Sequence, residues 1–187
     1  MKTLIFNGSP RKKGNTAALI EALSERLGGE IKIVRAYDGE IRPCIDCRYC
    51  WTHRGCSIQD GMQAVYRDIE EADNIVIASP VHFSELSGQL LAVLSRLQTY
   101  WSAKYLRREE PVPKKKRAGV ILTRGGAGEQ KLHALETAKI ILGDVNAEIV
   151  GVVIADDSDR IPSLQREGVS RAIEDLAAAL RGDLSTQ

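Results

Sequence analysis

Residues 3–16 read TLIFNGSPRKKGNT and combine a short apolar run with a turn that contains two glycines. The run at residues 3–7 is typical of a β-strand, and Gly8 and Gly14 let the backbone turn tightly after it. An amphipathic segment follows and predicts a helix from about Thr16 to Leu27. The stretch therefore predicts a strand, a loop and a helix in succession, which is the basic unit of an α/β fold.

The same alternation continues along the rest of the chain. Apolar runs predict strands at residues 31–37, 74–79, 117–123 and 148–155, and amphipathic segments predict helices at 61–71, 87–101, 129–142 and 164–181. Strands this apolar are expected where both faces are buried, and strict alternation implies a parallel sheet. We therefore expect one α/β domain over residues 1–187, with a doubly wound five-stranded parallel sheet and helices on both faces.

The composition limits the class of protein. The chain has 187 residues, and 26 basic and 25 acidic side chains give a formal net charge of +1, so no bulk attraction to nucleic acid is expected. The first residues contain an apolar run of only three, and no later run approaches the length of a membrane span. We expect a cytoplasmic protein that has neither nucleic acid nor a membrane as a partner.

The loop after the first predicted strand has the features of an anion site. In a doubly wound sheet the ligand lies at the carboxyl ends of the strands, which directs attention to the loops after strands one, three and four. Asn15 or Thr16 can cap the helix that follows, and N–H groups at a helix start bind anions. The sequence lacks both G-x-G-x-x-G and G-x-x-x-x-G-K-[ST], so neither a dinucleotide fingerprint nor a P-loop fits. From the spacing alone, a plain turn with an N-cap is an equal alternative.

Three loops resemble those of the flavodoxin-like NAD(P)H-dependent FMN reductases. GSPRKKGNT at 8–16 is similar to the family's phosphate loop, SPVHFSELSGQLLAVLSR at 79–96 to the loop and helix beside the isoalloxazine ring, and TRGGAGEQ at 123–130 to the glycine-rich loop over the other part of the ring. The resemblance covers most of the chain, from Lys2 to about Leu180. It implies a flavodoxin-like sheet with strand order 2-1-3-4-5 and a bound FMN.

The resemblance also assigns individual residues to the cofactor. On the FMN phosphate it places the side chains of Ser9, Arg11, Asn15 and Thr16 and backbone groups of Pro10 and Gly14. Along one side of the ring it places Pro80, Val81, His82 and Phe83, and on the opposite side Thr123, Gly125 and Gly126. Glycines let backbone N–H groups approach the flavin edge, where donors tune its reduction. One departure is that His82 stands where relatives often carry Tyr or Trp, so Phe83 is the alternative stacking residue.

All four cysteines lie in PCIDCRYCWTHRGC, residues 43–56, with the spacing C-x2-C-x2-C-x5-C. In a reducing cytosol such a group more often binds metal or performs redox chemistry than forms disulfides. Residues 43–60, the cysteine segment, replace a short strand-to-helix connection and are an insertion into the fold. The segment resembles the compact motif of iron–sulfur flavoproteins, which implies a [4Fe–4S] cluster close to the FMN with the ligands Cys44, Cys47, Cys50 and Cys56.

Two other interpretations of the cysteines stay open. Buried cysteines behave as small apolar residues and can serve in packing alone. Four thiolates also form structural zinc sites, although zinc knuckles usually have a longer spacer than this one. The segment departs from the iron–sulfur flavoproteins at Gly61, which stands where they carry a second Asp, so Asp60 alone is left to cap the next helix.

These features lead to one main hypothesis and one alternative. The main hypothesis is an FMN-dependent oxidoreductase that takes electrons from NADH or NADPH and passes them to a small-molecule acceptor, such as a flavin or quinone, or to a small redox protein. No side chain stands out as a catalytic acid or base. The alternative is an iron–sulfur flavoprotein that relays electrons through FMN and a [4Fe–4S] cluster and has no substrate pocket of its own.

The resemblance implies a homo-oligomer as well, because the family tends to dimerise with the flavin near the interface. We expect a homodimer or a tetramer. Leu94, Leu97, Tyr100 and Trp101 are candidates for the partner surface, and the alternative is that they simply cover the sheet.

Overall fold

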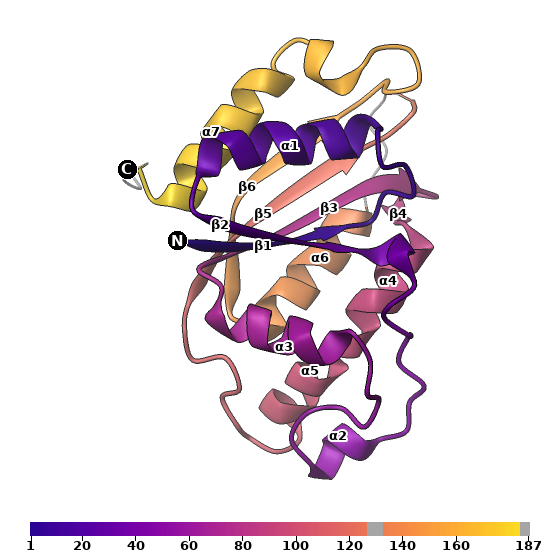
Figure 1. Ribbon diagram of the computed structural model, residues 1–187, viewed down its shortest axis with the longest axis vertical. Helices are drawn as coiled ribbons and strands as arrows, with labels where there is room; N and C mark the ends of the chain where they lie inside the picture. The colour runs from indigo at the N-terminus through magenta and orange to yellow at the C-terminus, as the bar shows by residue number, and fades with distance from the viewer. Residues whose placement is uncertain (127–132, 184–187) are drawn as a thin grey trace.

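The computed structural model describes residues 1–126 and 133–183 and has a parallel sheet at its centre (Figure 1). The long strands are β1 (Lys2–Asn7), β2 (Glu30–Arg35), β3 (Asn74–His82), β5 (Lys116–Thr123) and β6 (Ala147–Ala155). They lie in the order β2-β1-β3-β5-β6, and the two-residue strand β4 (Glu85–Leu86) pairs antiparallel with the end of β3. Counted over the long strands alone, the order is 2-1-3-4-5, which confirms the predicted topology.

Helices cover both faces of this sheet (Figure 1). On one face lie α1 (Asn15–Leu27) and α7 (Val169–Arg181), and on the other α3 (Met62–Glu71), α4 (Gly88–Leu94), α5 (Gln98–Tyr105) and α6 (His133–Asp144). Two predicted helices differ in detail, because 3-10 turns interrupt them: η2 (Ser95–Leu97) separates α4 from α5, and η3 (Ser163–Gln165) precedes α7. The predicted start of the fourth helix at Glu129 lies outside the described residues.

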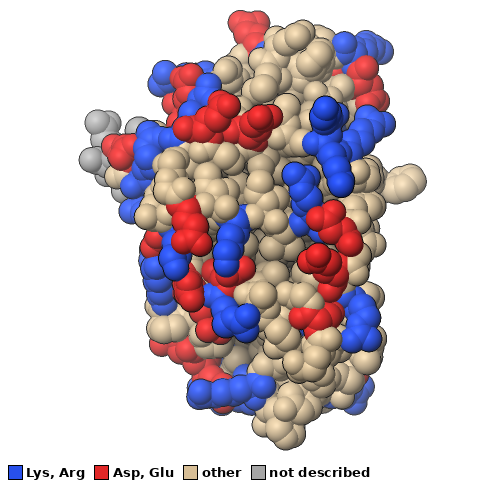
Figure 2. Space-filling view, in the orientation of Figure 1, with Lys and Arg blue, Asp and Glu red and all other residues tan. Residues whose placement is uncertain are grey.

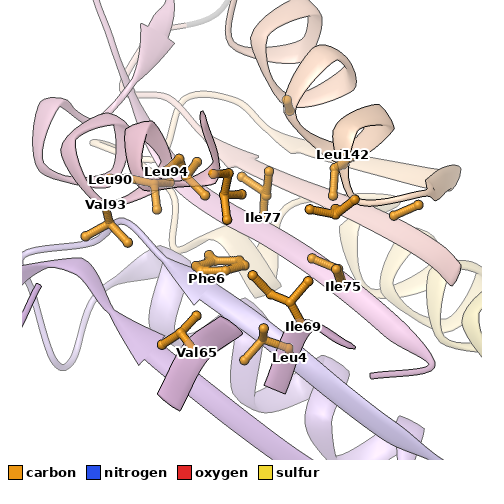
Figure 3. Close-up of a cluster of buried hydrophobic side chains, with 14 of the residues drawn as sticks. Leu4, Phe6, Val65, Ile69, Ile75, Ile77, Leu90, Val93, Leu94 and Leu142 are labelled. Carbon is orange, nitrogen blue, oxygen red and sulfur yellow. The ribbon is translucent and has the colours of Figure 1, made fainter. Parts of the chain in front are cut away.

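The central strands bury both of their faces. Leu4 and Phe6 of β1 pack with side chains of α3 and α4, as Figure 3 shows, while Ile5 between them contacts the layer of α1 and α7. This alternation follows from the two-residue period of a strand. The sheet and its two apolar layers therefore hold the strand ends, and the loops that leave them, in fixed relative positions.

The helices after β3 contribute to this core. Leu94, Leu97 and Tyr100 are at most 4% exposed and belong to the apolar cluster on the α3 side of the sheet. The prediction that these three residues form a partner surface is therefore wrong, and the alternative that they cover the sheet is correct. Their apolar character is explained by packing alone.

The cysteine segment leaves the layered arrangement after the 3-10 turn η1 (Ala36–Asp38). It consists of extended chain and one helical turn, α2 (Tyr49–Thr52), which lies beside α5 at the lower end of Figure 1. Asp60 ends the segment, and its Oδ1 accepts a hydrogen bond of 3.0 Å from the N–H of Met62, the first residue of α3, although the N-cap position itself is Gly61 and not Asp60. The segment is thus an excursion between two regular elements and not part of either layer.

Charged side chains of both signs are interspersed with uncharged areas on the face that Figure 2 shows. Lysines and arginines alternate with aspartates and glutamates there, so this face offers no continuous area of one sign. None of the helices in the described part of the chain has the length and apolar character that a bilayer span requires.

Candidate functional site

A pocket of about 270 Å³ opens where the loops after β1, β3, β5 and β6 meet, and we call it the strand-edge pocket. Eleven of the thirteen residues predicted for the flavin line it: Ser9, Pro10, Arg11, Gly14, Asn15, Thr16, Pro80, Val81, His82, Thr123 and Gly125. The other two, Phe83 and Gly126, are exposed and lie outside this lining. The structure therefore brings three loops that are distant in sequence to one place, at the edge of the sheet where a doubly wound fold binds its ligand.

The N-terminus of α1 reaches this pocket without a capping side chain. Gly14 is the N-cap residue, no side chain bonds to the first N–H groups, and the first turn contains no acidic residue. The prediction that Asn15 or Thr16 caps the helix is wrong, because both side chains bond elsewhere. The positive end of a helix of 13 residues is thus left for an anion.

Thr16 joins the loop after β1 to the end of β5. Its hydroxyl is buried and lies 2.8 Å from the hydroxyl of Thr123. One hydroxyl of such a pair donates to the other, so the second keeps a proton that it can donate to a ligand. The pair therefore offers one hydrogen bond from the floor of the pocket.

Asn15 connects α1 to the loop after β6. Its Nδ2 donates to the carbonyl oxygen of Ser158 at 2.8 Å, and its Oδ1 accepts from the N–H of Ser163 at 2.9 Å. The amide side chain thus holds the neighbouring loop in place.

Sequence reasoning missed the loop after β6. Ser158 and Asp159 line the strand-edge pocket, and the Asp159 carboxylate occupies the space that a Cβ at position 125 would fill. A side chain at position 125 would therefore have to displace the Asp159 carboxylate. One signal in the sequence could have indicated these two residues: they closely follow a predicted strand, as do the loops after the first, third and fourth predicted strands.

The loops after β5 and β6 form one continuous wall. Arg124 Nη2 donates to Asp156 Oδ2 at 2.8 Å, and this hydrogen bond holds the pKa of Asp156 below its usual value. The N–H of Ser158 also donates to the carbonyl of Arg124 at 3.0 Å. Because these bonds link the loops directly, the wall is supported by both strands.

The strand-edge pocket fits the phosphate of FMN. It combines an uncapped helix start, the spare proton of the Thr16–Thr123 pair and the hydroxyl of Ser9. Arg11 is exposed and adds a positive charge to the lining of this pocket. These groups are donors or cations, which is the chemistry that a phosphate dianion requires, and the Asp159 carboxylate is the one acidic side chain among the described residues of the lining.

A second pocket, the cysteine pocket, is lined by all four cysteines together with residues of η2 and its surroundings. All four are free thiols. Cys47 Sγ lies 3.2 Å from the hydroxyl of Ser57, and Cys50 Sγ lies 3.4 Å from that of Ser102. Within residues 1–126 and 133–183, no three His, Cys, Asp or Glu side chains are gathered as a metal site. The thiols therefore share a pocket without forming a finished ligand cage.

One wall of the cysteine pocket includes a buried arginine, Arg96. Its side chain is fully buried, lines this pocket and leaves Nε without a hydrogen-bond partner. Buried donors are normally paired, and the sulfurs of a metal–thiolate group accept N–H bonds. The four thiols and this guanidinium therefore fit an anionic metal–thiolate group in their chemistry, although the thiols would have to move together to ligate it.

The two pockets are separate. The residues that line the strand-edge pocket and those that line the cysteine pocket have no member in common. The resemblance implied a cluster close to the FMN, but within one chain the two sites are built from different residues.

Comparison with known proteins decides the family. Residues 1–158 match the family model described as NADPH-dependent FMN reductase. The chain belongs to this family. The match includes every residue that lines the cysteine pocket and all but Asp159 of those that line the strand-edge pocket.

Among the curated relatives of this FMN reductase family member are proteins named iron–sulfur flavoprotein. One from Methanocaldococcus jannaschii is 37% identical over 99 residues, which is 51% of this chain and 51% of that protein. One from Methanosarcina thermophila is 31% identical over 137 residues, or 70% of this chain and 68% of that protein. The chain thus spans about half the length of the first of these relatives and about two thirds of the second.

Solved structures share the fold. The NAD(P)H:quinone oxidoreductase from Methanothermobacter marburgensis superimposes with a TM-score of 0.73 over 100% of this chain and 99% of that one, at 18% identity. At this identity the likeness concerns the fold of the FMN reductase family and not its chemistry.

Proposed function

We propose that the chain is an NAD(P)H-dependent FMN oxidoreductase with one FMN-binding domain over residues 1–187. The observation that carries this proposal is the strand-edge pocket, which collects eleven of the thirteen residues expected for the flavin. Membership of the NADPH-dependent FMN reductase family supports the same activity.

In this proposal the residues of the pocket have distinct tasks. The start of α1, Ser9 and the Thr16–Thr123 pair would hold the phosphate, and Arg11 would add a positive charge at the surface. The ring would lie between the loop after β3, with Pro80, Val81, His82 and Phe83, and the loop after β5, with Thr123, Gly125 and Gly126. The bound flavin would supply the hydride and electron-transfer chemistry, so the chain needs no acid or base of its own.

The test is a titration of the cofactor-free protein with FMN and with FAD by calorimetry. We expect FMN to bind more tightly, because the pocket offers a site for a terminal phosphate and the sequence has no fingerprint for an adenylate half. The loaded protein should then oxidise NADH or NADPH in the presence of a quinone or free flavin. A clear preference for FAD, or no turnover with any of these acceptors, would argue against the proposal.

A second candidate function rests on the cysteine pocket. We propose as the alternative that Cys44, Cys47, Cys50 and Cys56 hold a [4Fe–4S] cluster and that the protein transfers single electrons. The shared pocket of the four thiols supports this, and so does the name of the curated relatives. Turnover only with a reduced ferredoxin, and not with NAD(P)H, would favour this function over the first.

Iron, sulfide and flavin analysis of anaerobically purified protein tests the cluster directly. We expect the single changes C44A, C47A, C50A and C56A to remove most of the iron, because the core needs four thiolates. FMN should remain bound in each variant, since the pockets share no lining residue. If wild-type protein contains flavin but neither iron nor zinc, the cysteines act in packing or thiol chemistry.

The protein is further proposed to be a cytoplasmic homodimer or tetramer that passes electrons to a small molecule or a small redox protein. Phe83 supports a partner surface, because it is fully exposed beside the strand-edge pocket and has a φ of 53°. A left-handed conformation costs roughly 1–2 kcal/mol in a residue other than glycine. Light scattering on the purified chain should give a dimer or tetramer mass, and a monomer at high concentration would contradict the assembly.

A further inference from the structure

Arg96 lies in η2, between α4 and α5, and its side chain has no exposed surface. Burial of a guanidinium removes it from water and is unfavourable unless its hydrogen bonds and charge are met inside the protein. The partners of Arg96 therefore indicate why a cation stands at this position.

Those partners are the two ends of the cysteine segment. Nη1 donates to the carbonyl of Arg42 at 2.9 Å, just before the segment begins. Nη2 donates to the carbonyl of Ile58 at 3.2 Å, just after the last cysteine. One side chain therefore bonds to the chain on both sides of the four thiols.

Asp60 completes this closure. Its Oδ2 accepts from Arg96 Nη1 at 2.7 Å, and the same oxygen accepts from the N–H of Arg42 at 3.0 Å. Ser95, which precedes Arg96 in η2, accepts a hydrogen bond of 3.0 Å from the N–H of Cys44 through its hydroxyl. The cysteine segment is thus closed into a ring against η2, and Arg96 is the residue that contacts both of its ends.

The guanidinium has one further property. It lines the cysteine pocket, and its Nε is buried without a partner. An ion pair with Asp60 and two carbonyl contacts explain a structural tie, but they leave Nε unexplained in a side chain that lines the pocket of the four thiols. Four thiolates around zinc or an iron–sulfur core give a group with a net negative charge, whose sulfurs accept N–H bonds.

We propose that Arg96 is the positioning residue of the cysteine pocket: it closes the segment around the thiols and supplies the positive charge and the N–H donor that an anionic metal–thiolate group requires. This inference rests on the second proposed function, in which the four cysteines hold a metal centre. It adds a residue from outside the cysteine motif to that site.

The test compares R96M and R96K with R54M, a control that removes an exposed arginine of the cysteine segment. Arg54 is 85% exposed and does not line the cysteine pocket, so its loss should leave metal binding within about twofold of wild type. R96M should weaken binding of Co²⁺ by about tenfold or more, read from the thiolate-to-cobalt absorption, as is usual for residues that support metal ligands. R96K keeps the charge and N–H donors but loses the planar arrangement of the guanidinium, and should recover part of this loss.

A second measurement, the iron and sulfide content after anaerobic reconstitution, distinguishes an iron–sulfur cluster from a site that binds a single metal ion such as zinc. If a cluster forms, its reduction potential should be more negative in R96M than in R96K, because the reduced core gains negative charge next to a lost cation. A purely structural role for Arg96 would not order the two variants in this way. Flavin content and thermal unfolding establish that each variant is folded.

The results separate the two proposals. If wild-type protein binds no metal, the second function fails and this inference with it. If wild-type protein binds metal and R96M binds it equally well, or if R54M loses as much as R96M, only the role of Arg96 is overturned. If R96M does not fold, R96K is compared with wild type instead. Lysine lacks the planar guanidinium, so an R96K variant with the metal affinity and reduction potential of wild type would contradict a positioning role.

Discussion

The strand-edge pocket and the cysteine pocket belong to the same chain but are held together by different kinds of contact. Four loops that leave the parallel strands at one edge build the strand-edge pocket, and main-chain bonds such as that from Ser158 to Arg124 connect them. A long segment with a single helical turn builds the cysteine pocket. The first site is a direct consequence of the sheet, and the second is added to it.

Side chains from neighbouring helices hold the cysteine segment in place. Gln63 of α3 donates to the carbonyl of Ile58 at 2.8 Å, and Thr99 of α5 donates to that of Gly55 at 2.9 Å. Arg107 donates to the carbonyl of Cys50, and Arg96 bonds to both ends. Few side chains therefore decide the position of the thiols, whereas two apolar layers support the loops of the other pocket. Single substitutions should damage the cysteine pocket more selectively than the strand-edge pocket.

The largest expected effect comes from Asp60→Ala. The change leaves Arg96 buried without its counter-charge, and removal of one partner of a buried ion pair typically costs about 3–5 kcal/mol. Urea unfolding would measure the loss. The control is Asp175→Ala, which breaks a pair with Arg171 on the surface of α7 and should cost less than about 1 kcal/mol. If both variants lose the same free energy of unfolding, the buried ion pair is no more important for stability than the exposed one, and the prediction is wrong.

Thr16→Val tests the strand-edge pocket at its floor. The variant keeps the shape of the side chain but removes the hydroxyl pair with Thr123, so FMN should lose a bond to a charged group, on the order of 1.5–3 kcal/mol. Calorimetry gives the affinity, and Thr52→Val on the exposed α2 is the matched control. An unchanged affinity would mean that the phosphate is bound elsewhere.

Acid should weaken the closure of the cysteine segment before it affects the sheet. Burial alone raises the pKa of Asp60, but hydrogen bonds from Arg96 and from the N–H groups of Arg42 and Met62 lower it overall. Because the folded-state pKa lies below the unfolded-state value, this contribution to stability is complete above the unfolded-state pKa and is lost as the pH falls through the folded-state pKa. The loss should be smaller than that of Asp60→Ala, since the protonated acid still accepts hydrogen bonds.

The contribution of the Asp60 carboxylate to stability is measured by unfolding curves of wild type and Asp60→Asn from neutral pH down to about pH 3. This range includes the ordinary carboxyl pKa, which is near 4. The variant lacks the titrating group and should lose less stability over the acid range. Parallel curves for the two proteins would show that Asp60 does not contribute.

Arg11→Gln is expected to have the smallest effect. The side chain is exposed, so its attraction to a phosphate is screened by salt and should contribute less than about 1 kcal/mol. Calorimetric titrations at low and high salt would show a difference from wild type at low salt only. A loss as large as that of Thr16→Val, retained at high salt, would place Arg11 in direct and desolvated contact with the cofactor.

Much of the strand-edge pocket could be predicted from the sequence. The loops after three strands were recognised because strands and helices have local periods, and because parallel strands end at one edge. The contribution of Ser158 and Asp159 could not be seen, since it depends on how the last strand lies beside the others. Phe83 lies in the turn between β3 and β4, is fully exposed and is not part of the pocket lining, so its place along the ring stays a prediction.

The sequence by itself determined the succession of strands and helices, the position of the loops and the presence of four thiols in one insertion, and the resemblance to a family supplied the order of the strands in the sheet. The tertiary structure decided which side chains connect them. Asn15 bonds to Ser158 across 143 positions of the chain, and Arg96 bonds to Asp60 across 36. Apolar periodicity is a local signal that a short window reveals, whereas a buried hydrogen bond between distant residues exists only after the sheet and helices have packed. The thiols are therefore visible in the sequence, but the arginine that lines the same pocket is recognised only in the folded chain.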